Sequence, residues 1–208
     1  MSIAIVDYGV GNIKSIQHCL NRFGLSYEYT SDYNKILNSE KVIFPGVGDA
    51  AYAMNKLKSK GLDKVIIDIK QPLLGICLGM QLLCNSTEEG NTDCLGIIDL
   101  DVLKFDSENK KVPQIGWNNI YDLDSKIFSD TNENDFIYMV HSYYVPLSKF
   151  TIAKTKYGIE YSSAIKKDNF YGTQFQKEAP TIPKATTYHM FAKKITLIRS
   201  VNDHTVFN

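Results

Sequence analysis

Leu74-Gly75-Ile76-Cys77-Leu78-Gly79-Met80-Gln81 is the stretch of this sequence that decides the fold. The apolar run over residues 71–77 predicts a buried strand that passes directly into a helix starting near Leu78. Such a sharp turn crowds the backbone around its central residue, so small residues are needed two positions before it and two positions after it. Gly75 and Gly79 meet this need. The pattern is typical of a nucleophile elbow and nominates Cys77 as a catalytic thiol.

Strands alternate with helices on both sides of this elbow over the first 85 residues. Apolar runs at 2–6 and 41–44 predict two further strands. Helical spacing of apolar residues predicts a helix between Asn12 and Gly24, and others over 50–60 and 62–69. This order predicts a parallel sheet covered by helices on both faces, with sites at the carboxyl ends of its strands. Beyond Thr87 the sequence predicts short β-rich pieces at 102–105, 115–121, 136–144, 151–157, 164–166 and 170–175.

The composition narrows the range of partners and compartments. Lys plus Arg and Asp plus Glu number 23 each, so no global field favours nucleic acid or an anionic membrane. We expect a cytoplasmic protein, because neither a signal peptide nor an apolar segment long enough to span a bilayer is recognisable. The four cysteines form no CxxC pair, and no His or Cys pair has the spacing of zinc ligands. We therefore expect thiols and no metal.

The position predicted for Cys77 suits a nucleophile. Unpaired amides and the dipole at a helix N-terminus lower the pKa of a thiol and favour the thiolate. The Leu78 amide would face a developing oxyanion, and Pro45-Gly46-Val47-Gly48 could present a second amide donor with little steric penalty. The alternatives are a buried structural cysteine in a glycine-containing turn and a plain loop joining a strand to a helix. Spacing alone weighs the two interpretations of Cys77 equally.

Several motifs together resemble one enzyme family, in its order along the chain. They are Asp7-Tyr8-Gly9-Val10-Gly11-Asn12, Pro45-Gly46-Val47-Gly48, Gly75-Ile76-Cys77-Leu78-Gly79-Met80-Gln81, Gly116-Trp117-Asn118 and His141-Ser142-Tyr143. The chain resembles the class I glutamine amidotransferases, and among them the glutaminase subunits of imidazole glycerol phosphate synthase. The resemblance implies a flavodoxin-like three-layer α/β fold with a mainly parallel sheet and a β-rich second half. We expect one amidotransferase domain over residues 1–208, family-like over 1–175 and divergent over 176–208.

The resemblance also implies a reaction, a substrate and a partner. Glutamine would be hydrolysed to glutamate and ammonia through a glutamyl thioester on Cys77, without a metal or organic cofactor. Ammonia would pass to a separate (β/α)8 cyclase subunit in a heterodimer that serves histidine biosynthesis. By position, Val47 and Leu78 would lie at the oxyanion hole, while Asn12 and Tyr138 would face the cyclase. The residues that would hold glutamine are Gly48, Gln81, Ser142 and Tyr143.

One element of the family pattern is missing. The family ends its last core strand with Gly-x-Gln-Phe-His-Pro-Glu, whereas this chain places Gln176 where the catalytic histidine stands. A neutral amide cannot accept the thiol proton, and a general base is worth roughly 10² to 10⁴ in rate. Glu178 keeps the third position of the triad, either as a catalytic carboxylate or as an ordinary surface one. The chain has four histidines, at His18, His141, His189 and His204. Of these, His141 and His189 are weak candidates for a substitute base.

Three functions therefore stay open. The first is a glutaminase subunit of imidazole glycerol phosphate synthase whose activity is impaired by Gln176. The second is a paralogue that delivers ammonia to a surface-sugar or other synthase, and the third is a non-catalytic module that docks on a synthase and regulates it. A separate hypothesis is that Gln176-Lys177-Glu178 is the family motif read out of frame, because codons for a His-Pro-Glu-Arg-Ser run can contain Gln-Lys-Glu in another frame.

Overall fold

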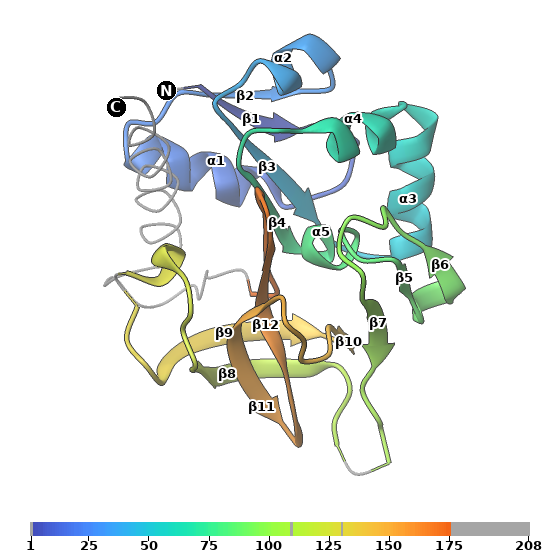
Figure 1. Ribbon diagram of the computed structural model, residues 1–208, viewed down its shortest axis with the longest axis vertical. Coiled ribbons are helices and arrows are strands. Elements are labelled where there is room, and N and C mark those ends of the chain that lie inside the picture. The colour runs from blue at the N-terminus through green and yellow to red at the C-terminus, as the bar shows by residue number, and fades with distance from the viewer. Residues whose placement is uncertain (1, 109, 130, 176–208) are drawn as a thin grey trace, which may run out of the picture.

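A seven-stranded sheet lies at the centre of the computed structural model, which describes residues 2–108, 110–129 and 131–175 (Figure 1). Its strand order is β11-β12-β13-β4-β3-β1-β2. The five parallel strands are β1 (Ile3–Val6), β2 (Tyr27–Thr30), β3 (Lys41–Gly46), β4 (Leu73–Cys77) and β13 (Phe170–Thr173). Antiparallel pairing adds β12 (Ile159–Lys167) and β11 (Thr151–Tyr157) at one edge. The predicted mainly parallel sheet is confirmed.

Helices cover both faces of this sheet, as predicted (Figure 1). In β1, Ile3 and Ile5 point to one face and pack with Ile16 and Leu20 of α1. Ala4 and Val6 point to the other face, which also buries the apolar side chains of α3 and α4. This alternation follows from the two-residue period of a strand. The helices are α1 (Ile13–Arg22), α2 (Tyr33–Leu37), α3 (Ala50–Ser59), α4 (Leu62–Asp68) and α5 (Leu78–Gln81).

Local signals account for most helix ends. The first helix starts after Asn12, although the Asn12 side chain makes no capping bond, and Gly24 follows its end with a left-handed φ of 63°. The Asp49 carboxylate caps α3 by accepting a hydrogen bond of 2.8 Å from the Tyr52 amide. The sequence prediction missed β2 and α2. The strand β2 is the edge strand of the sheet and buries none of its residues, so it lacks the apolar pattern that reveals an inner strand.

The second half is rich in strands, as predicted, and forms two smaller sheets beside the end of the large one (Figure 1). One contains β5 (Ser86–Thr87), β6 (Thr92–Asp93), β7 (Asp101–Lys104) and β10 (Tyr143–Tyr144). The other is the antiparallel pair β8 (Gln114–Ile120) and β9 (Asp135–His141). Two short 3₁₀ helices, η1 (Glu89–Asn91) and η2 (Lys126–Phe128), lie in the connections.

Two strand predictions in this half are wrong in their extent. The single strand expected over 136–144 is divided at Ser142, because β9 pairs with β8 whereas β10 leaves that pair to join β7. The short strand expected over 164–166 is part of the longer β12. Both differences arise because each strand pairs with strands that are distant in the sequence, and a local sequence pattern does not reveal such pairing.

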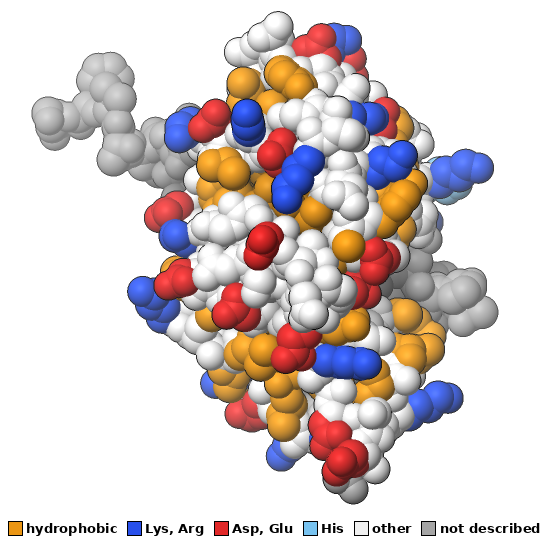
Figure 2. Space-filling view, turned by 90° about the vertical axis from the view of Figure 1, so that its right-hand side faces the viewer, with side chains coloured by type: hydrophobic (Ala, Val, Ile, Leu, Met, Phe, Trp, Pro, Cys, Tyr) orange, Lys and Arg blue, Asp and Glu red, His pale blue; other side chains and the backbone are white. Residues whose placement is uncertain are grey.

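The surface agrees with the balanced charge of the chain. Figure 2 shows basic and acidic side chains interspersed over one face of the molecule, with apolar side chains between them. Within the described residues, no helix is long and apolar enough to cross a membrane.

Candidate active site

The elbow at Cys77 has the strand-to-helix geometry that the sequence predicts. Cys77 is the last residue of β4 and directly precedes α5, with φ 54° and ψ −114°. A positive φ is unfavourable for a residue with a Cβ, so the surrounding structure has to hold it. The parallel register of β3 and β4 places Gly46 beside Cys77. The thiol therefore lies at the carboxyl edge of the sheet, next to the loop that follows β3.

Two glycines allow the short helix α5 to approach the sheet closely. A Cβ on Gly79 would lie 2.1 Å from the Phe44 carbonyl oxygen, and a Cβ on Gly75 would lie 2.7 Å from the Gly79 oxygen. Real Cβ atoms do not approach backbone atoms this closely, so any larger residue would force α5 away from β3 and β4. The small residues around Cys77 are thus required by packing as well as by the turn itself.

The environment of the sulfur differs from the one predicted. Burial raises the pKa of the Cys77 thiol to about 11, and the nearby Glu89 carboxylate adds to this rise. Hydrogen bonds from the Leu78 amide and from Gln174 act in the opposite direction but do not compensate. The prediction that the helix N-terminus favours the thiolate is therefore wrong in its net direction. The reason is that burial of the sulfur outweighs the hydrogen bond from the Leu78 amide at the start of α5.

The loop after β3 lies against the elbow. The Tyr8 hydroxyl donates a hydrogen bond of 2.6 Å to the Pro45 carbonyl, and this side chain is fully buried. Val47 is 38% exposed, and Gly48 has a left-handed φ of 82° with open space around it. The predicted oxyanion residues Val47 and Leu78 thus lie on the two segments that meet at Gly46 and Cys77.

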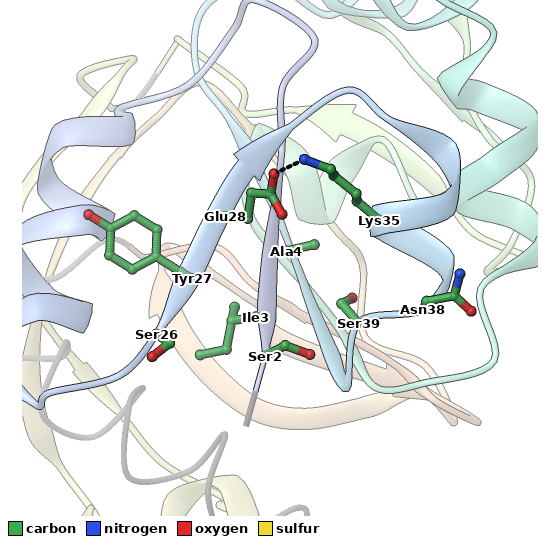
Figure 3. A pocket seen from close by; sticks show the side chains of 9 residues that line it. All are labelled: Ser2, Ile3, Ala4, Ser26, Tyr27, Glu28, Lys35, Asn38 and Ser39. Atoms are coloured by element: carbon green, nitrogen blue, oxygen red, sulfur yellow. Dashed lines mark hydrogen bonds and ion pairs between the residues drawn. The ribbon is translucent and has the colours of Figure 1, made fainter.

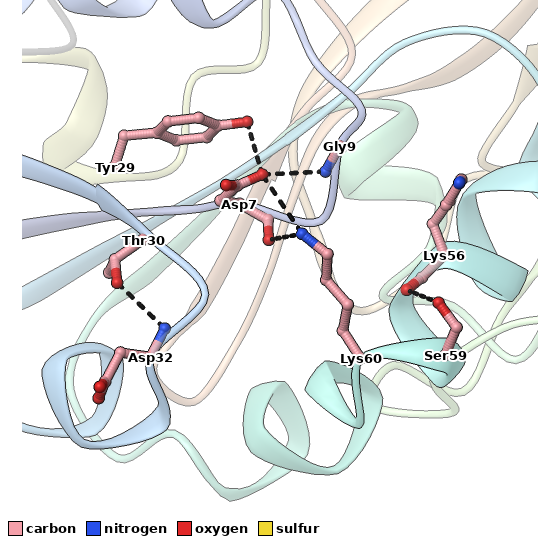
Figure 4. A network of polar contacts seen from close by, with 8 residues as sticks. All are labelled: Asp7, Gly9, Tyr29, Thr30, Asp32, Lys56, Ser59 and Lys60. Carbon is pink, nitrogen blue, oxygen red and sulfur yellow. Dashed lines mark hydrogen bonds and ion pairs between the residues drawn. The ribbon is translucent and has the colours of Figure 1, made fainter.

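Asp7 ties the end of β1 to its neighbours beside this loop (Figure 4). Its carboxylate accepts hydrogen bonds of 3.1 Å from the Gly9 amide and 2.7 Å from the Tyr29 hydroxyl. The Lys60 ammonium lies 3.6 Å from the same carboxylate oxygen and donates to the Asp7 backbone carbonyl at 3.0 Å. These contacts fix the start of the segment 7–12, the first of the motifs that carry the family resemblance.

Two of the four predicted glutamine-binding residues, Gln81 and Tyr143, are in direct contact. Gln81 is buried, and its Nε2 donates to the Tyr143 carbonyl at 3.2 Å and to the Gln174 Oε1 at 2.8 Å. Ser142 precedes Tyr143, and its carbonyl accepts a hydrogen bond of 3.0 Å from the Phe105 amide. Gly48 lies in the loop after β3. The structure thus brings Gln81 and Tyr143 into contact.

Gln174 is a site residue that the sequence interpretation missed. It is 1% exposed, and its Nε2 lies 3.6 Å from the Cys77 sulfur. The signal was present in the sequence, because Gln174 stands in the run Gly172-Thr173-Gln174-Phe175 that matches the end of the family's last core strand. Once β13 pairs with β4 in parallel, with Thr173 beside Ile76, the next residue comes beside Cys77.

The described histidines are not placed to act on Cys77. His141 engages both ring nitrogens, with the Tyr143 carbonyl at 2.7 Å and with the Tyr161 hydroxyl at 3.2 Å. Burial lowers its pKa to about 4, so the ring is neutral near pH 7. His18 is exposed on α1, as expected for its polar face. The predictions for Gln176, Glu178, His189 and His204 lie outside the described residues.

Other features of the described residues lie away from the elbow. A cavity of about 360 Å³ opens between the amino ends of β1 and β2 and the turn after α2, with the Glu28–Lys35 ion pair across it (Figure 3). Cys77 stands at the carboxyl end of β4, so this cavity belongs to the opposite edge of the parallel strands. Among residues 2–108, 110–129 and 131–175, no group of three or more His, Cys, Asp and Glu side chains could hold a metal ion.

Comparison with known proteins decides the family. The family model for "Glutamine amidotransferase class-I" matches residues 4–194. The chain belongs to the class I glutamine amidotransferases. The match includes the elbow, the loop after β3 and Gln174. It also continues past residue 175, where the motifs that carry the resemblance end.

Relatives of known name agree with this membership of the amidotransferase family. The chain is 49% identical over 180 residues to "Imidazole glycerol phosphate synthase subunit HisH" of Bacteroides fragilis strain YCH46, covering 86% of this chain and 92% of that protein. The proteins of the same name from Shewanella loihica and Escherichia coli K12 are 40% and 39% identical. The match to the Shewanella loihica protein covers 91% of this chain and 89% of that protein. The match to the Escherichia coli protein covers 86% of this chain and 92% of that protein. The predicted assignment to a glutamine amidotransferase is confirmed.

Solved structures show the same fold at low identity. The structure of a glutamine amidotransferase has a TM-score of 0.69 at 12% identity and covers 94% of this chain and 98% of its own. The structure of PurLQS from Thermotoga maritima has a TM-score of 0.63 at 15% identity and covers 97% and 98%. The predicted amidotransferase fold is therefore confirmed.

Proposed function

We propose that this chain is a glutaminase subunit of an imidazole glycerol phosphate synthase. The observation that carries the proposal is the Cys77 elbow at φ 54°, flanked by Gly46 of β3 and by Gln174, the residue that follows β13. Its relatives named imidazole glycerol phosphate synthase subunit HisH support the choice of synthase. The substrate is L-glutamine, and no metal or organic cofactor takes part.

The reaction divides into two acyl transfers at Cys77. The sulfur attacks the side-chain amide carbon of glutamine, the carbon–nitrogen bond breaks, and ammonia leaves with the proton that the thiol gives up. Water then adds to the thioester carbon, the carbon–sulfur bond breaks, and glutamate is released with the thiol restored. The amides of Val47 and Leu78 are the proposed donors to the oxyanion of both tetrahedral intermediates.

The substrate glutamine is proposed to bind between the loop after β3 and the start of β10. Gly48 and Tyr143 would frame it, and the preceding Ser142 would present polar backbone groups to its α-amino and carboxylate ends. Gln81 contacts the start of β10, because its Nε2 donates a hydrogen bond to the Tyr143 carbonyl. This arrangement supports a site that recognises a small polar amino acid.

The partner is proposed to be a (β/α)8 cyclase subunit in a heterodimer. Tyr138 lies on the outward face of β8 and β9, where its ring contacts Trp117 with 5.6 Å between the centroids. Four apolar side chains on this face are 44% to 59% exposed, and they are Ile115, Trp117, Phe136 and Val140. Exposed aromatic and aliphatic side chains in one face are typical of a protein interface. Asn12, exposed before α1, is the second position proposed to face the cyclase.

The activity of the chain is proposed to be impaired. Gln176 cannot act as a base, and both ring nitrogens of His141 are occupied by other groups. The thiol proton then has to leave without a general base, which costs roughly 10² to 10⁴ in rate. The free thiols Cys19, Cys77, Cys84 and Cys94 support a reducing compartment, for which we propose the cytoplasm.

The test is turnover of the purified chain with a cyclase subunit of imidazole glycerol phosphate synthase. Glutamine-dependent turnover should be low and ammonia-dependent turnover normal, and Gln176→His should raise the former by about 10²-fold or more. Cys77→Ala should abolish glutamine-dependent turnover and spare ammonia-dependent turnover. High glutaminase activity that Gln176→His leaves unchanged would contradict the impairment, and failure to bind the cyclase would contradict the choice of synthase.

The second candidate is a non-catalytic module that docks on a synthase and regulates it, which Gln176 favours. In that case the complex forms, and neither Gln176→His nor added glutamine produces turnover. A paralogue serving a surface-sugar or other synthase shares the chemistry, and the neighbouring genes distinguish it.

A further inference from the structure

Gln174 comes beside Cys77 through the register of the sheet. β13 pairs in parallel with β4, with Gly172 beside Gly75 and Thr173 beside Ile76. The next residue of each segment is Gln174 and Cys77, and the Gln174 Nε2 lies 3.6 Å from the Cys77 sulfur. The backbone amide of Gln174 donates a hydrogen bond of 2.9 Å to the Ser163 carbonyl of β12, so the backbone on both sides is fixed. The contact is thus built by the fold rather than by a surface side chain.

The direction of the hydrogen bonds is determined by a backbone carbonyl. The Tyr143 carbonyl can only accept, so the Gln81 atom that faces it at 3.2 Å is the amide nitrogen. The same nitrogen donates at 2.8 Å to Gln174, which therefore presents its oxygen to Gln81. The NH₂ group of Gln174 is then the one that faces the sulfur. The order of donation runs from Gln81 to Gln174 and from Gln174 to Cys77.

We propose that Gln174 is a catalytic residue that donates a hydrogen bond to the Cys77 thiolate, and that Gln81 is the positioning residue that orients it. The proposal deepens the proposed glutaminase function. Gln174 neither takes nor gives a proton, because an amide does not titrate near neutral pH. It stabilises negative charge on sulfur before the attack on glutamine and again when the thioester breaks.

The chemistry around the sulfur explains why such a donor matters. Burial disfavours the thiolate, and the Glu89 carboxylate disfavours it further. Two groups act against this, the Leu78 amide and the Gln174 side chain. A hydrogen bond to a charged group is stronger than one between neutral groups, and more so in a buried site. Removing one of two such donors should therefore reduce the thiolate fraction at every pH below the pKa of the thiol.

The test is alkylation of Cys77 by iodoacetamide in the full chain, followed by mass spectrometry of the Cys77 peptide. The thiolate sulfur forms a bond to the methylene carbon while iodide leaves, so the rate below the pKa follows the thiolate fraction. Gln174→Met, which is neutral and of similar length, should slow alkylation by about tenfold from about pH 7 to about pH 10. Gln174→Glu keeps an acceptor for Gln81 but places an oxygen at the sulfur, and should slow it further.

Two further variants make the test specific. Gln81→Met leaves Gln174 without its orienting donor and should slow alkylation by less than Gln174→Met does. Gln71→Met is the matched control, because it also removes a glutamine side-chain bond, of 2.7 Å to the Ile36 carbonyl, away from the elbow. It should leave the alkylation rate unchanged. The unfolding midpoint of each variant shows that the compared chains are folded.

The proposal is overturned if folded Gln174→Met alkylates at the parent rate across the pH range. If Gln174→Met does not fold, Gln174→Glu decides in the same way, since an unchanged or faster rate contradicts a donor role. Alkylation requires neither glutamine, a base nor a partner. A Gln176→His chain that still lacks glutaminase activity with the cyclase would therefore count against the proposed function and leave this test valid.

Discussion

Replacing Gly79 by alanine tests whether the close approach of α5 to the sheet holds the elbow. Two effects oppose each other. Alanine in a helix is favoured over glycine by about 1 kcal/mol. Against this, the new Cβ would lie 2.1 Å from the Phe44 oxygen and 3.1 Å from the Phe44 carbonyl carbon. Both are backbone atoms of a central strand and cannot rotate away, so the cost should be at the upper end of the roughly 1–3 kcal/mol typical of overpacking. We expect a net loss of about 2 kcal/mol in the free energy of unfolding.

Urea unfolding followed by circular dichroism measures this loss, which corresponds to a shift of about 1 M in the midpoint for a slope of about 2 kcal/mol/M. Because Leu78 carries the amide that bonds the sulfur, Gly79→Ala should also slow alkylation of Cys77. Gly24→Ala is the control. It also adds a methyl group, at φ 63° with no atom within 4 Å, so it should cost about 1–2 kcal/mol of backbone strain and leave Cys77 unaffected. A Gly79→Ala chain as stable as the parent would refute the packing argument, since helix propensity alone predicts no loss of stability.

Three further predictions concern single side chains of the structure, and a fourth concerns the gene. Tyr8→Phe leaves the buried Pro45 carbonyl without its donor, so the free energy of unfolding should fall by about 1–3 kcal/mol in urea titrations, with lower glutaminase turnover. Burial lowers the pKa of His141 to about 4, whereas in the unfolded chain it titrates near 6.5, so the unfolded state binds more protons between these values. Stability should therefore fall by up to about 3 kcal/mol as the pH drops from 6.5 to 4, and unfolding curves of His141→Gln should lack this part of the dependence. Trp117→Ala should weaken binding of the cyclase by about tenfold or more in calorimetry and lower the unfolding midpoint only slightly, because the ring is 44% exposed and loses its contact with Tyr138. Translating the gene in its three frames should reveal a His-Pro-Glu run near codon 176 if Gln176 arose from a shift of frame, and its absence would exclude that origin.

The sequence contained most of the information that places the elbow. The period of apolar residues predicted β1, β3, β4 and the helices α1, α3 and α4, because buried parallel strands and amphipathic helices have distinct patterns. The glycines around Cys77 predicted the sharp turn for a steric reason that the structure reproduces. Local patterns were sufficient here because each of these features depends on neighbours in the chain.

The electrostatics of the site could not be predicted in this way. The helix N-terminus was expected to favour the thiolate, yet the pKa of Cys77 is raised because burial outweighs the hydrogen bonds from the Leu78 amide and Gln174. Burial depends on the whole fold, and Gly46 and Gln174, which lie beside Cys77 in the structure, are far from it in sequence. The division of the strand predicted over 136–144 has the same origin, since β10 pairs with a strand of another sheet.

Gly172 shows how packing of the core determines which side chain reaches the sulfur. A Cβ on Gly172 would lie 2.6 Å from the Met80 side chain of α5, so the register that places a glycine there lets β13 pass α5 without moving Met80. Successive side chains of a strand point to opposite faces, so a slip by one residue would bring Thr173 against Met80 and turn Gln174 away from Cys77. The contact between Gln174 and the thiol is therefore fixed by a glycine two residues earlier. We expect any larger residue at Gly172 to disturb the chemistry of Cys77 through this register, even though it touches neither the thiol nor the substrate.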